Sequence, residues 1–251
     1  MTDPDDLDRS AATSTRLDVD GTHNFREVVA VTADGRTLRA GRLFRSDALR
    51  ELTAEGRAAL VDLGIRRIVD MRAAEEVAIA PDLVEGVGAE TLSIPILDGA
   101  VTIGLPTTDL RGVYRHILHD YGSQVGAAIR AVAEADGPVI VHCTAGKDRT
   151  GLVVALVLLA LGVDLDAVAA DYAVTEVNLA RGWADRTLAA IASRHGEVSE
   201  DLVEIIARSP EPVLRETIAW LVAEHGSIEG YLDAIGVDAA VRARLAAELL
   251  D

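Results

Sequence analysis

The stretch that most constrains the fold is residues 138–151, which read Pro-Val-Ile-Val-His-Cys-Thr-Ala-Gly-Lys-Asp-Arg-Thr-Gly. The β-branched run 139–141 predicts a short buried strand, and the apolar run 152–161 predicts a buried helix after it. Cys143 and Arg149 lie between the two. Backbone N–H groups and the positive end of the helix dipole gather at such a turn. The sequence therefore predicts an anion-binding loop with a thiol at its centre.

This loop favours an ionised thiol that can attack phosphorus. A free cysteine has a pKa of about 8.5, and a helix N-terminus or a nearby cation lowers that value by several units. Arg149 offers a planar fork that matches two oxygens of a phosphoryl group. Gly146 is expected to adopt a backbone angle that other residues resist, which lets N–H groups point inward. The residues expected to bind phosphate or support the thiolate are Thr144, Ala145, Gly146, Lys147 and Thr150.

Two other interpretations of the loop are weaker. A buried, inert cysteine is common in proteins, but an inert site needs no arginine, lysine and aspartate within six residues. A nucleotide-binding P-loop is excluded, because Asp148 stands where that motif has serine or threonine and Val141 stands where it has its first glycine.

The pattern His142-Cys143-x5-Arg149-Thr150-Gly151 resembles the signature of the cysteine-dependent protein tyrosine phosphatase superfamily. The full loop is similar to that of an atypical bacterial branch, the tyrosine/serine phosphatase family with mycobacterial members. Further segments resemble motifs of that branch and follow in the same order: Asn24-Phe25-Arg26-Glu27, Gly41 to Ser46, Val69-Asp70-Met71-Arg72, Asp171-Tyr172 and Gly226 to Leu232.

This resemblance implies roles for the loop residues. Cys143 would be the nucleophile, Arg149 would bind the phosphoryl group, and Asp148 would act as general acid. Conventional tyrosine phosphatases carry that aspartate on a separate upstream loop, so Asp98, ahead of Gly99, remains the alternative acid, and a loop brace paired with Lys147 remains the alternative role for Asp148. A Gly-Lys pair at this position resembles phosphatases that act on phosphoinositides, whereas the other interpretation of Lys147 is a solvated surface lysine.

Several residues outside the loop are candidates for the site. Asp70 and Arg72 follow a predicted strand, and ligands bind at the carboxyl ends of strands in α/β sheets. We expect Arg72 to bind phosphate or to orient Asp148, and Asp70 to brace Arg149, with a structural salt bridge as the alternative for both. Asn24, Phe25 and Arg26 are expected near the rim of the pocket, with Phe25 favoured as core packing. Asp171 and Tyr172 are expected to secure the helix layer behind the loop.

The order of elements predicts an α/β fold, a central mostly parallel sheet flanked by helices. Strands are expected up to Ser46 and at 67–70, 91–94 and 139–141. Helices are expected at 53–63 with Thr53 as its cap, at 109–135 with a break near Gly122, from near Thr150, and almost throughout after Gly162. Ser199 and Asp238 are expected to cap two of these later helices. Residues 1–16 are predicted to be a disordered acidic tail, 17–251 a single phosphatase domain, and 183–209 a candidate helical lid, with ordinary helical packing as the alternative.

The composition limits the classes of partner that the protein is expected to bind. The net charge of −17 argues against binding to nucleic acid or to anionic membranes, and the longest apolar run is too short to span a bilayer. Cys143 is the only cysteine, so the chain forms no internal disulfide. The acidic, polar first residues do not resemble a signal peptide, which favours a cytoplasmic location, with signal-independent export as the alternative.

These features predict a protein tyrosine phosphatase that needs no metal or cofactor. The expected substrates are phosphoproteins, with dual specificity or phospholipid substrates as further possibilities, and inorganic phosphate is the product held in the site. A non-catalytic phosphate-binding module with the same loop is the alternative. Sulfur transfer by a rhodanese-like loop is disfavoured by Arg149-Thr150-Gly151.

Overall fold

The structure, a computed structural model, describes residues 14–97 and 109–251. Its centre is a five-stranded sheet in the order β1-β2-β5-β3-β4, with bounds β1 (Arg26–Glu27), β2 (Leu43–Ser46), β3 (Arg67–Asp70), β4 (Glu90–Ser93) and β5 (Val139–His142). β1 pairs antiparallel with β2, and all other pairs are parallel. The predicted α/β fold with a mostly parallel sheet is confirmed.

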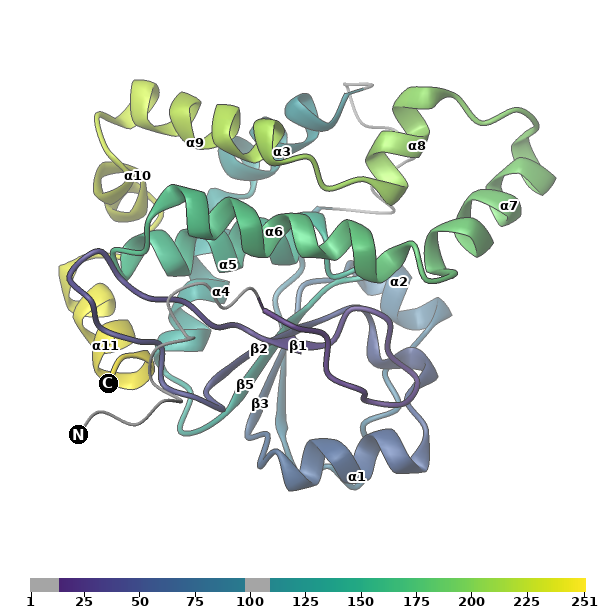
Figure 1. Ribbon diagram of the computed structural model, residues 1–251, viewed down its shortest axis with the longest axis horizontal. Helices are drawn as coiled ribbons and strands as arrows, with labels where there is room; N and C mark the ends of the chain where they lie inside the picture. The colour runs from purple at the N-terminus through teal and green to yellow at the C-terminus, as the bar shows by residue number, and fades with distance from the viewer. Residues whose placement is uncertain (1–13, 98–108) are drawn as a thin grey trace, which may run out of the picture.

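Helices cover both faces of the sheet (Figure 1). They are the short 3-10 helix η3 (Leu49–Glu51), α1 (Ala54–Asp62), α2 (Ala74–Ile79), α3 (Leu110–Asp120), α4 (Gly122–Ala133), α5 (Asp148–Ala160), α6 (Leu165–Leu179), α7 (Trp183–His195), α8 (Glu200–Ala207), α9 (Glu211–His225), α10 (Ile228–Ala234) and α11 (Ala239–Leu249). Among the described residues, none of these helices combines the length and apolarity needed to cross a membrane.

The central strand β5 joins the two layers of the core. Val139 and Val141 pack into the larger cluster, formed with α3, α4, α5 and the C-terminal helices, while Ile140 packs into the smaller cluster around α1. This alternation is the period of two expected for a strand buried on both faces. The core therefore fixes the direction in which the chain leaves β5 at His142.

Helix α5 starts at Asp148, two residues before the predicted start, and is buried from Asp148 to Leu158. A helix that is apolar all round must lie inside the protein, and α5 packs between the sheet and the outer helices (Figure 1). The loop 143–147 therefore lies between the carboxyl end of a central strand and the amino end of a central helix.

Local sequence signals account for most helix ends. The side chains of Thr53, Ser199 and Asp238 accept hydrogen bonds from backbone N–H groups at the starts of α1, α8 and α11, as predicted. The predicted helix 109–135 is divided at Tyr121 into α3 and α4, as expected from Gly122. Among the elements of residues 14–97 and 109–251, the short helices η3 and α2 were not predicted.

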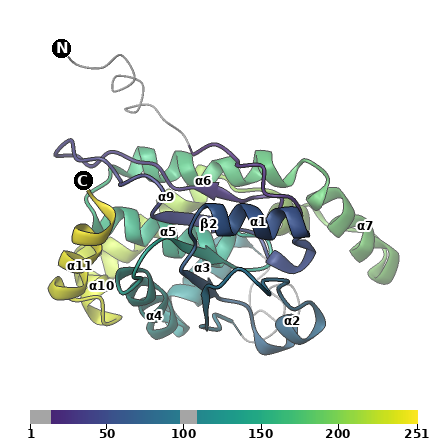
Figure 2. The ribbon, with the colours of Figure 1, turned by 90° about the horizontal axis from the view of Figure 1, so that it is seen from below.

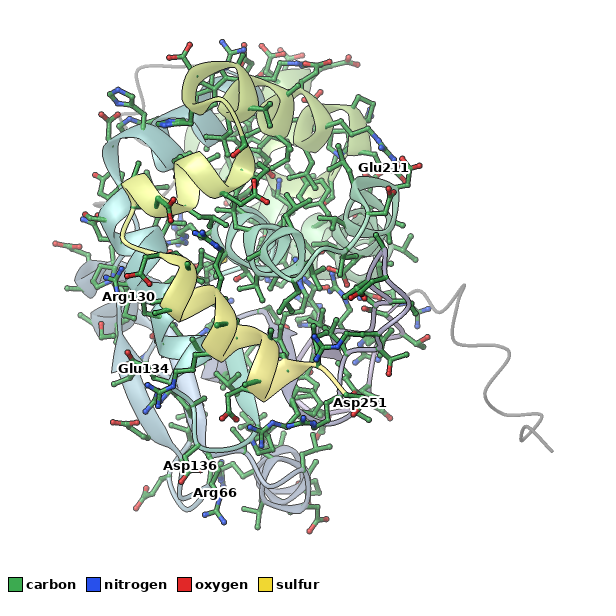
Figure 3. All side chains as sticks on the ribbon, turned by 90° about the vertical axis from the view of Figure 1, so that its left-hand side faces the viewer. Arg66, Arg130, Glu134, Asp136, Glu211 and Asp251 are labelled. Carbon is green, nitrogen blue, oxygen red and sulfur yellow. The ribbon has the colours of Figure 1, made fainter. Side chains whose placement is uncertain are left out.

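The C-terminal end of the chain lies on the side of the sheet opposite to α7 (Figure 1). The last residue, Asp251, lies at the end of α11 (Figure 3), and its N–H donates to the carbonyl of Thr37 at 3.1 Å. In contrast, α7 projects from the body of the protein in both Figure 1 and the perpendicular view of Figure 2.

The predicted tail is shorter than expected at its inner end. Residues 1–13 lie outside the described part of the chain, but Ser14 is 2% exposed and its hydroxyl accepts a hydrogen bond from the N–H of Val29 at 3.2 Å. Arg16 forms a β-bridge with Arg26 at the edge of the sheet. Residues 14–16 therefore belong to the packed structure because they pair with the chain near β1.

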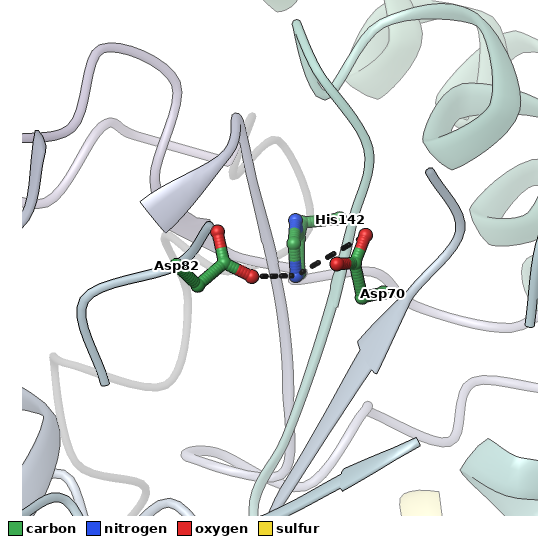
Figure 4. Close-up of side chains that lie close together, drawn as sticks. All are labelled: Asp70, Asp82 and His142. Carbon is green, nitrogen blue, oxygen red and sulfur yellow. Dashed lines mark ion pairs between the residues drawn. The ribbon is translucent and has the colours of Figure 1, made fainter. Parts of the chain in front are cut away.

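Next to the start of the loop lies a cluster of charged side chains formed by Asp70, Arg72, Asp82 and His142, of which Figure 4 draws Asp70, Asp82 and His142. Arg72 donates to Asp70 Oδ2 at 2.7 Å, and its Nη2 lies 2.8 Å from Asp82 Oδ2. His142 Nε2 lies 3.2 Å from Asp82 Oδ2 and 3.9 Å from Asp70 Oδ1. Burial alone would lower the pKa of His142, but the carboxylate of Asp82 raises it above its usual value. The carboxylate of Asp82 thus favours the charged form of His142, the residue before the loop.

We expect the pH dependence of the free energy of unfolding to reveal the interaction between His142 and Asp82. Because folding raises the pKa of His142, this residue stabilises the folded protein fully at pH values below its unfolded pKa of about 6.5. That stabilisation is lost as pH rises through the folded pKa. Asp82→Asn should lower the free energy of unfolding near pH 6 by about 3 kcal/mol, because it leaves buried charges without a partner. The deficit should shrink as pH rises.

Urea unfolding between pH 5.5 and 8.5 measures this difference. Asp166→Asn is the matched control, because Asp166 is 83% exposed and pairs with Arg215 at the surface. A deficit for Asp82→Asn that stays constant across this pH range would show that His142 is not charged in the folded protein.

Candidate active site

The loop opens into a cavity of about 270 Å³. Cys143 lies at its base and is only 2% exposed. The cavity is lined by residues of the loop, of α2, and of α7 and α8: Arg50, Glu76, Cys143, Thr144, Ala145, Lys147, Asp148, Arg149, Trp183, Thr187, Ile191, Ile205 and Ile206. Six residues expected at the site from the sequence therefore meet around one cavity.

The conformation of the loop depends on Gly146. Its φ is +65°, and a Cβ atom at this position would lie 2.3 Å from the carbonyl oxygen of Ser46. Both the left-handed backbone and the close approach exclude a side chain, as the sequence predicted. Gly146 does not itself line the cavity; it sets the course of the loop next to β2.

The carbonyl groups of the loop bond to residues behind it. Asn24 Nδ2 donates to the carbonyls of Ala145 and Gly146, both at 3.1 Å, and the carbonyl of Thr144 accepts from the N–H of Ala48 at 3.1 Å. Within the described residues, the N–H groups of 144–147 donate to no other protein group. Because backbone N–H groups demand a partner, such a set forms a concave site for an anion.

A second layer of buried charges holds these contacts. Arg45 Nη2 donates to the carbonyl of Gly146 at 2.9 Å, and Arg45 Nη1 pairs with Asp171 at 2.5 Å. Arg26 pairs with the same carboxylate and also bonds to Asn24. Burial, together with the charge of Arg45, lowers the pKa of Arg26 to about 9. Burial would raise the pKa of Asp171, but the two arginines lower it below its usual value.

The N-terminal motif therefore supports the loop from behind. Asn24 and Arg26, expected near the rim of the pocket, are fully buried and do not line the cavity. Phe25 is core packing, with its ring stacked on Phe44 at 5.6 Å between centroids. Asp171, on α6, links that helix to the loop through Arg45, which agrees with its expected role in securing the helix layer.

Arg149 is held by a carboxylate that the sequence did not reveal. Glu76, in α2, accepts from Nη1 of Arg149 at 2.6 Å and from Nη2 at 2.9 Å. Burial would raise the pKa of Glu76, but the hydrogen bond and charge of Arg149 lower it. Burial would likewise lower the pKa of Arg149, but Glu76 and Cys143 raise it above its usual value. Nε of Arg149 is buried without a partner among the described residues.

This arrangement leaves one side of the guanidinium for a ligand. Glu76 also accepts from the hydroxyl of Thr144 and, through Oε2, from the N–H of Ala73 at 2.9 Å, so its carboxylate has a fixed position. The expectation that Asp70 braces Arg149 is not supported, because the brace is Glu76. The sequence offered no local signal for Glu76, because its role depends on a contact with Arg149, 73 positions further along the chain.

Asp148 and Lys147 form an ion pair at the edge of the cavity. Nζ of Lys147 lies 2.9 Å from Asp148 Oδ1 and donates to the carbonyl of Arg208 at 2.9 Å. Lys147 is 1% exposed, so the alternative of a solvated surface lysine is wrong; the backbone after α8 covers it. Asp148 is 7% exposed and lines the cavity.

The far wall of the cavity is apolar and comes from the segment predicted as a lid. Trp183, Thr187 and Ile191 of α7 and Ile205 and Ile206 of α8 line it. A deep anion site below an apolar wall can bind a phosphate that carries an apolar or aromatic group.

The remaining candidates lie elsewhere. Asp70 and Arg72 form a buried salt bridge and are absent from the cavity lining, which matches the structural alternative for this pair. Thr150 is buried, and its hydroxyl has no hydrogen-bond partner among the described residues. Asp98, the alternative acid, lies outside the described residues.

Comparison with known proteins gives concordant matches. A model of the tyrosine phosphatase family matches residues 17–251. The triple specificity protein phosphatase PtpB of Mycobacterium tuberculosis is 33% identical, over 92% of this chain and 97% of that protein. A tyrosine-protein phosphatase of Nostoc commune is 28% identical, over 77% of this chain and 69% of its own length.

The family match includes every motif that carried the resemblance and every residue that lines the cavity. Because it extends over nearly the whole chain, and because a relative with 33% identity aligns along almost its full length, this protein belongs to the tyrosine phosphatase family and is a protein-tyrosine phosphatase.

Proposed function

We propose that the protein hydrolyses phosphomonoesters through a phosphocysteine intermediate. The observation that carries this proposal is the meeting of Cys143, Asp148 and Arg149 around one cavity of about 270 Å³. These are a nucleophile, a proton donor and a bidentate cation, the three groups that the transfer of a phosphoryl group to a side chain requires.

The first step forms a bond between Cys143 Sγ and phosphorus and breaks the bond from phosphorus to the ester oxygen. Asp148 gives its proton to the departing oxygen. In the second step Asp148 takes a proton from water, the resulting hydroxide attacks phosphorus, and the sulfur leaves as thiolate with release of inorganic phosphate. The N–H groups of the loop and Arg149 stabilise the charge on the phosphoryl oxygens in both steps.

The substrate we propose is phosphotyrosine in proteins. The apolar wall formed by Trp183, Ile191, Ile205 and Ile206 suits a phenyl ring above the loop. Phosphoserine and phosphothreonine have shorter side chains, which place less apolar surface against this wall. Comparing kcat/KM for phosphotyrosine peptides, phosphoserine peptides and a phosphoinositide in micelles tests the proposal, and a higher value for the lipid would overturn it.

We expect Cys143→Ser to abolish turnover and retain binding. Serine keeps the volume and the loop but is a far weaker nucleophile, so hydrolysis of p-nitrophenyl phosphate should fall by about a thousandfold or more. A phosphotyrosine peptide should still bind, as measured by calorimetry. Retained activity would favour a different nucleophile, and wild-type activity that disappears with a chelator would favour a metal-dependent reaction.

Asp148→Asn should slow esters with poor leaving groups much more than activated esters. A general acid contributes about 10²- to 10⁴-fold where the leaving oxygen needs a proton. We therefore expect a loss of about a hundredfold for phenyl phosphate and a much smaller loss for p-nitrophenyl phosphate. Asp166→Asn, at the exposed surface of α6, is the control. Equal losses for both esters would assign the acid to another residue.

A further inference from the structure

A pair of buried tyrosines connects Asp148 to the helices around it. Tyr114, on α3, and Tyr172, on α6, are 0% and 1% exposed. The hydroxyl of Tyr114 donates to Asp148 Oδ1 at 2.9 Å and lies 2.5 Å from the hydroxyl of Tyr172. Because the proton of Tyr114 is directed at the carboxylate, the short contact between the hydroxyls uses the proton of Tyr172.

The chain of hydroxyl groups has a defined direction. Tyr172 donates to Tyr114, and Tyr114 donates to Asp148. Burial, reinforced by the charge of Asp148, raises the pKa of both tyrosines, so both remain protonated donors throughout the working range of the protein. The rings meet edge to face with centroids 6.3 Å apart, which restricts the motion of either hydroxyl.

Lys147 forms an ion pair with the same carboxylate oxygen. Its Nζ lies 2.9 Å from Asp148 Oδ1, so that oxygen interacts with both an ammonium and a phenol. The hydrogen bond from Tyr114 and the charge of Lys147 therefore both act on Oδ1. In the part of the chain that the structure describes, Oδ2 of Asp148 accepts no hydrogen bond from the protein, although Asp148 lines the cavity.

From this asymmetry we infer that Tyr114 is a positioning residue for the general acid: with Lys147 it occupies Oδ1 of Asp148 and so assigns the transferred proton to Oδ2. The inference rests on the proposed role of Asp148. A carboxylic acid protonated on Oδ2 still accepts from Tyr114 through Oδ1, so the same contact serves the acid form in the first step and the base form in the second. Tyr172 keeps the Tyr114 hydroxyl aimed at the carboxyl group.

The geometry explains why a neutral donor is useful here. Lys147 lines the cavity, and a dianionic phosphate competes with Asp148 for its ammonium group. Tyr114 carries no charge, so its bond to Oδ1 persists when substrate arrives. Asp148 therefore keeps its orientation at the point in the reaction at which its ion pair weakens.

Tyr114→Phe tests the inference by leaving-group dependence. Loss of a bond to a charged acceptor should lower kcat for phenyl phosphate about tenfold, because the carboxyl group can then rotate away from the ester oxygen. The rate for p-nitrophenyl phosphate should change less than twofold, so kcat depends more steeply on the leaving group. Tyr172→Phe should shift this dependence in the same direction by a smaller amount.

Tyr231→Phe is the matched control. Tyr231 is also a buried tyrosine whose hydroxyl donates one hydrogen bond, to the carbonyl of Leu118 at 2.8 Å, but it lies outside the cavity. This variant should lower the rates for the two esters equally or not at all. If Tyr114→Phe folds poorly, Tyr172→Phe provides the same readout, and vanadate affinity checks that the loop is intact.

The double variant Tyr114→Phe with Asp148→Asn separates the two proposals. If Tyr114 acts through Asp148, adding Tyr114→Phe to Asp148→Asn causes no further loss of kcat for phenyl phosphate. Equal losses for both esters in Tyr114→Phe, while Asp148→Asn remains selective for poor leaving groups, would overturn this inference and leave the proposed function standing. If Asp148→Asn is itself unselective, the proposed acid is wrong.

Discussion

The site depends on the orientation of peptide groups in the loop between β5 and α5. Their carbonyl oxygens bond to Asn24, Arg45 and Ala48, and Gly146 adopts a left-handed conformation against β2. These contacts leave the N–H groups available to an anion. A chain with net charge −17 repels phosphate at long range, so binding rests on oriented N–H groups at close range.

Among the described residues, the buried arginines around the loop have anionic partners. Arg149 pairs with Glu76, Arg45 and Arg26 share Asp171, and Arg72 lies between Asp70 and Asp82. Burying a charge without a partner costs several kcal/mol, on the order of the stability of a whole domain. The pairing therefore keeps the guanidinium groups charged inside the protein and holds them in one geometry. For Arg149 this geometry leaves Nε without a hydrogen-bond partner in the part of the chain that the structure describes.

The sequence predicted the parts that depend on local chemistry. The strand, the loop and the helix at 139–160, the left-handed Gly146 and the caps at Thr53, Ser199 and Asp238 all follow from neighbouring residues. Glu76, Asp82 and Tyr114 act across long distances in sequence, so no local pattern identifies them. Tyr114 occupies an apolar position of an amphipathic helix, and an aromatic residue at such a position is expected to pack in the core. Its hydroxyl reaches Asp148 because α3 packs on α5.

Lys147 shows that tertiary packing can give a residue a different environment from the one its local sequence suggests. In the sequence it is a lysine in a polar loop. In the structure its ammonium group donates a hydrogen bond to the carbonyl of Arg208, after α8, and the side chain is buried from water. The same ammonium lies beside Asp148 and lines the cavity. One side chain therefore contacts the proposed acid, the phosphate-binding space and the end of the α7–α8 segment. Because that segment also supplies the apolar wall, the position of α8 affects both the fit of the substrate and the charge next to Asp148.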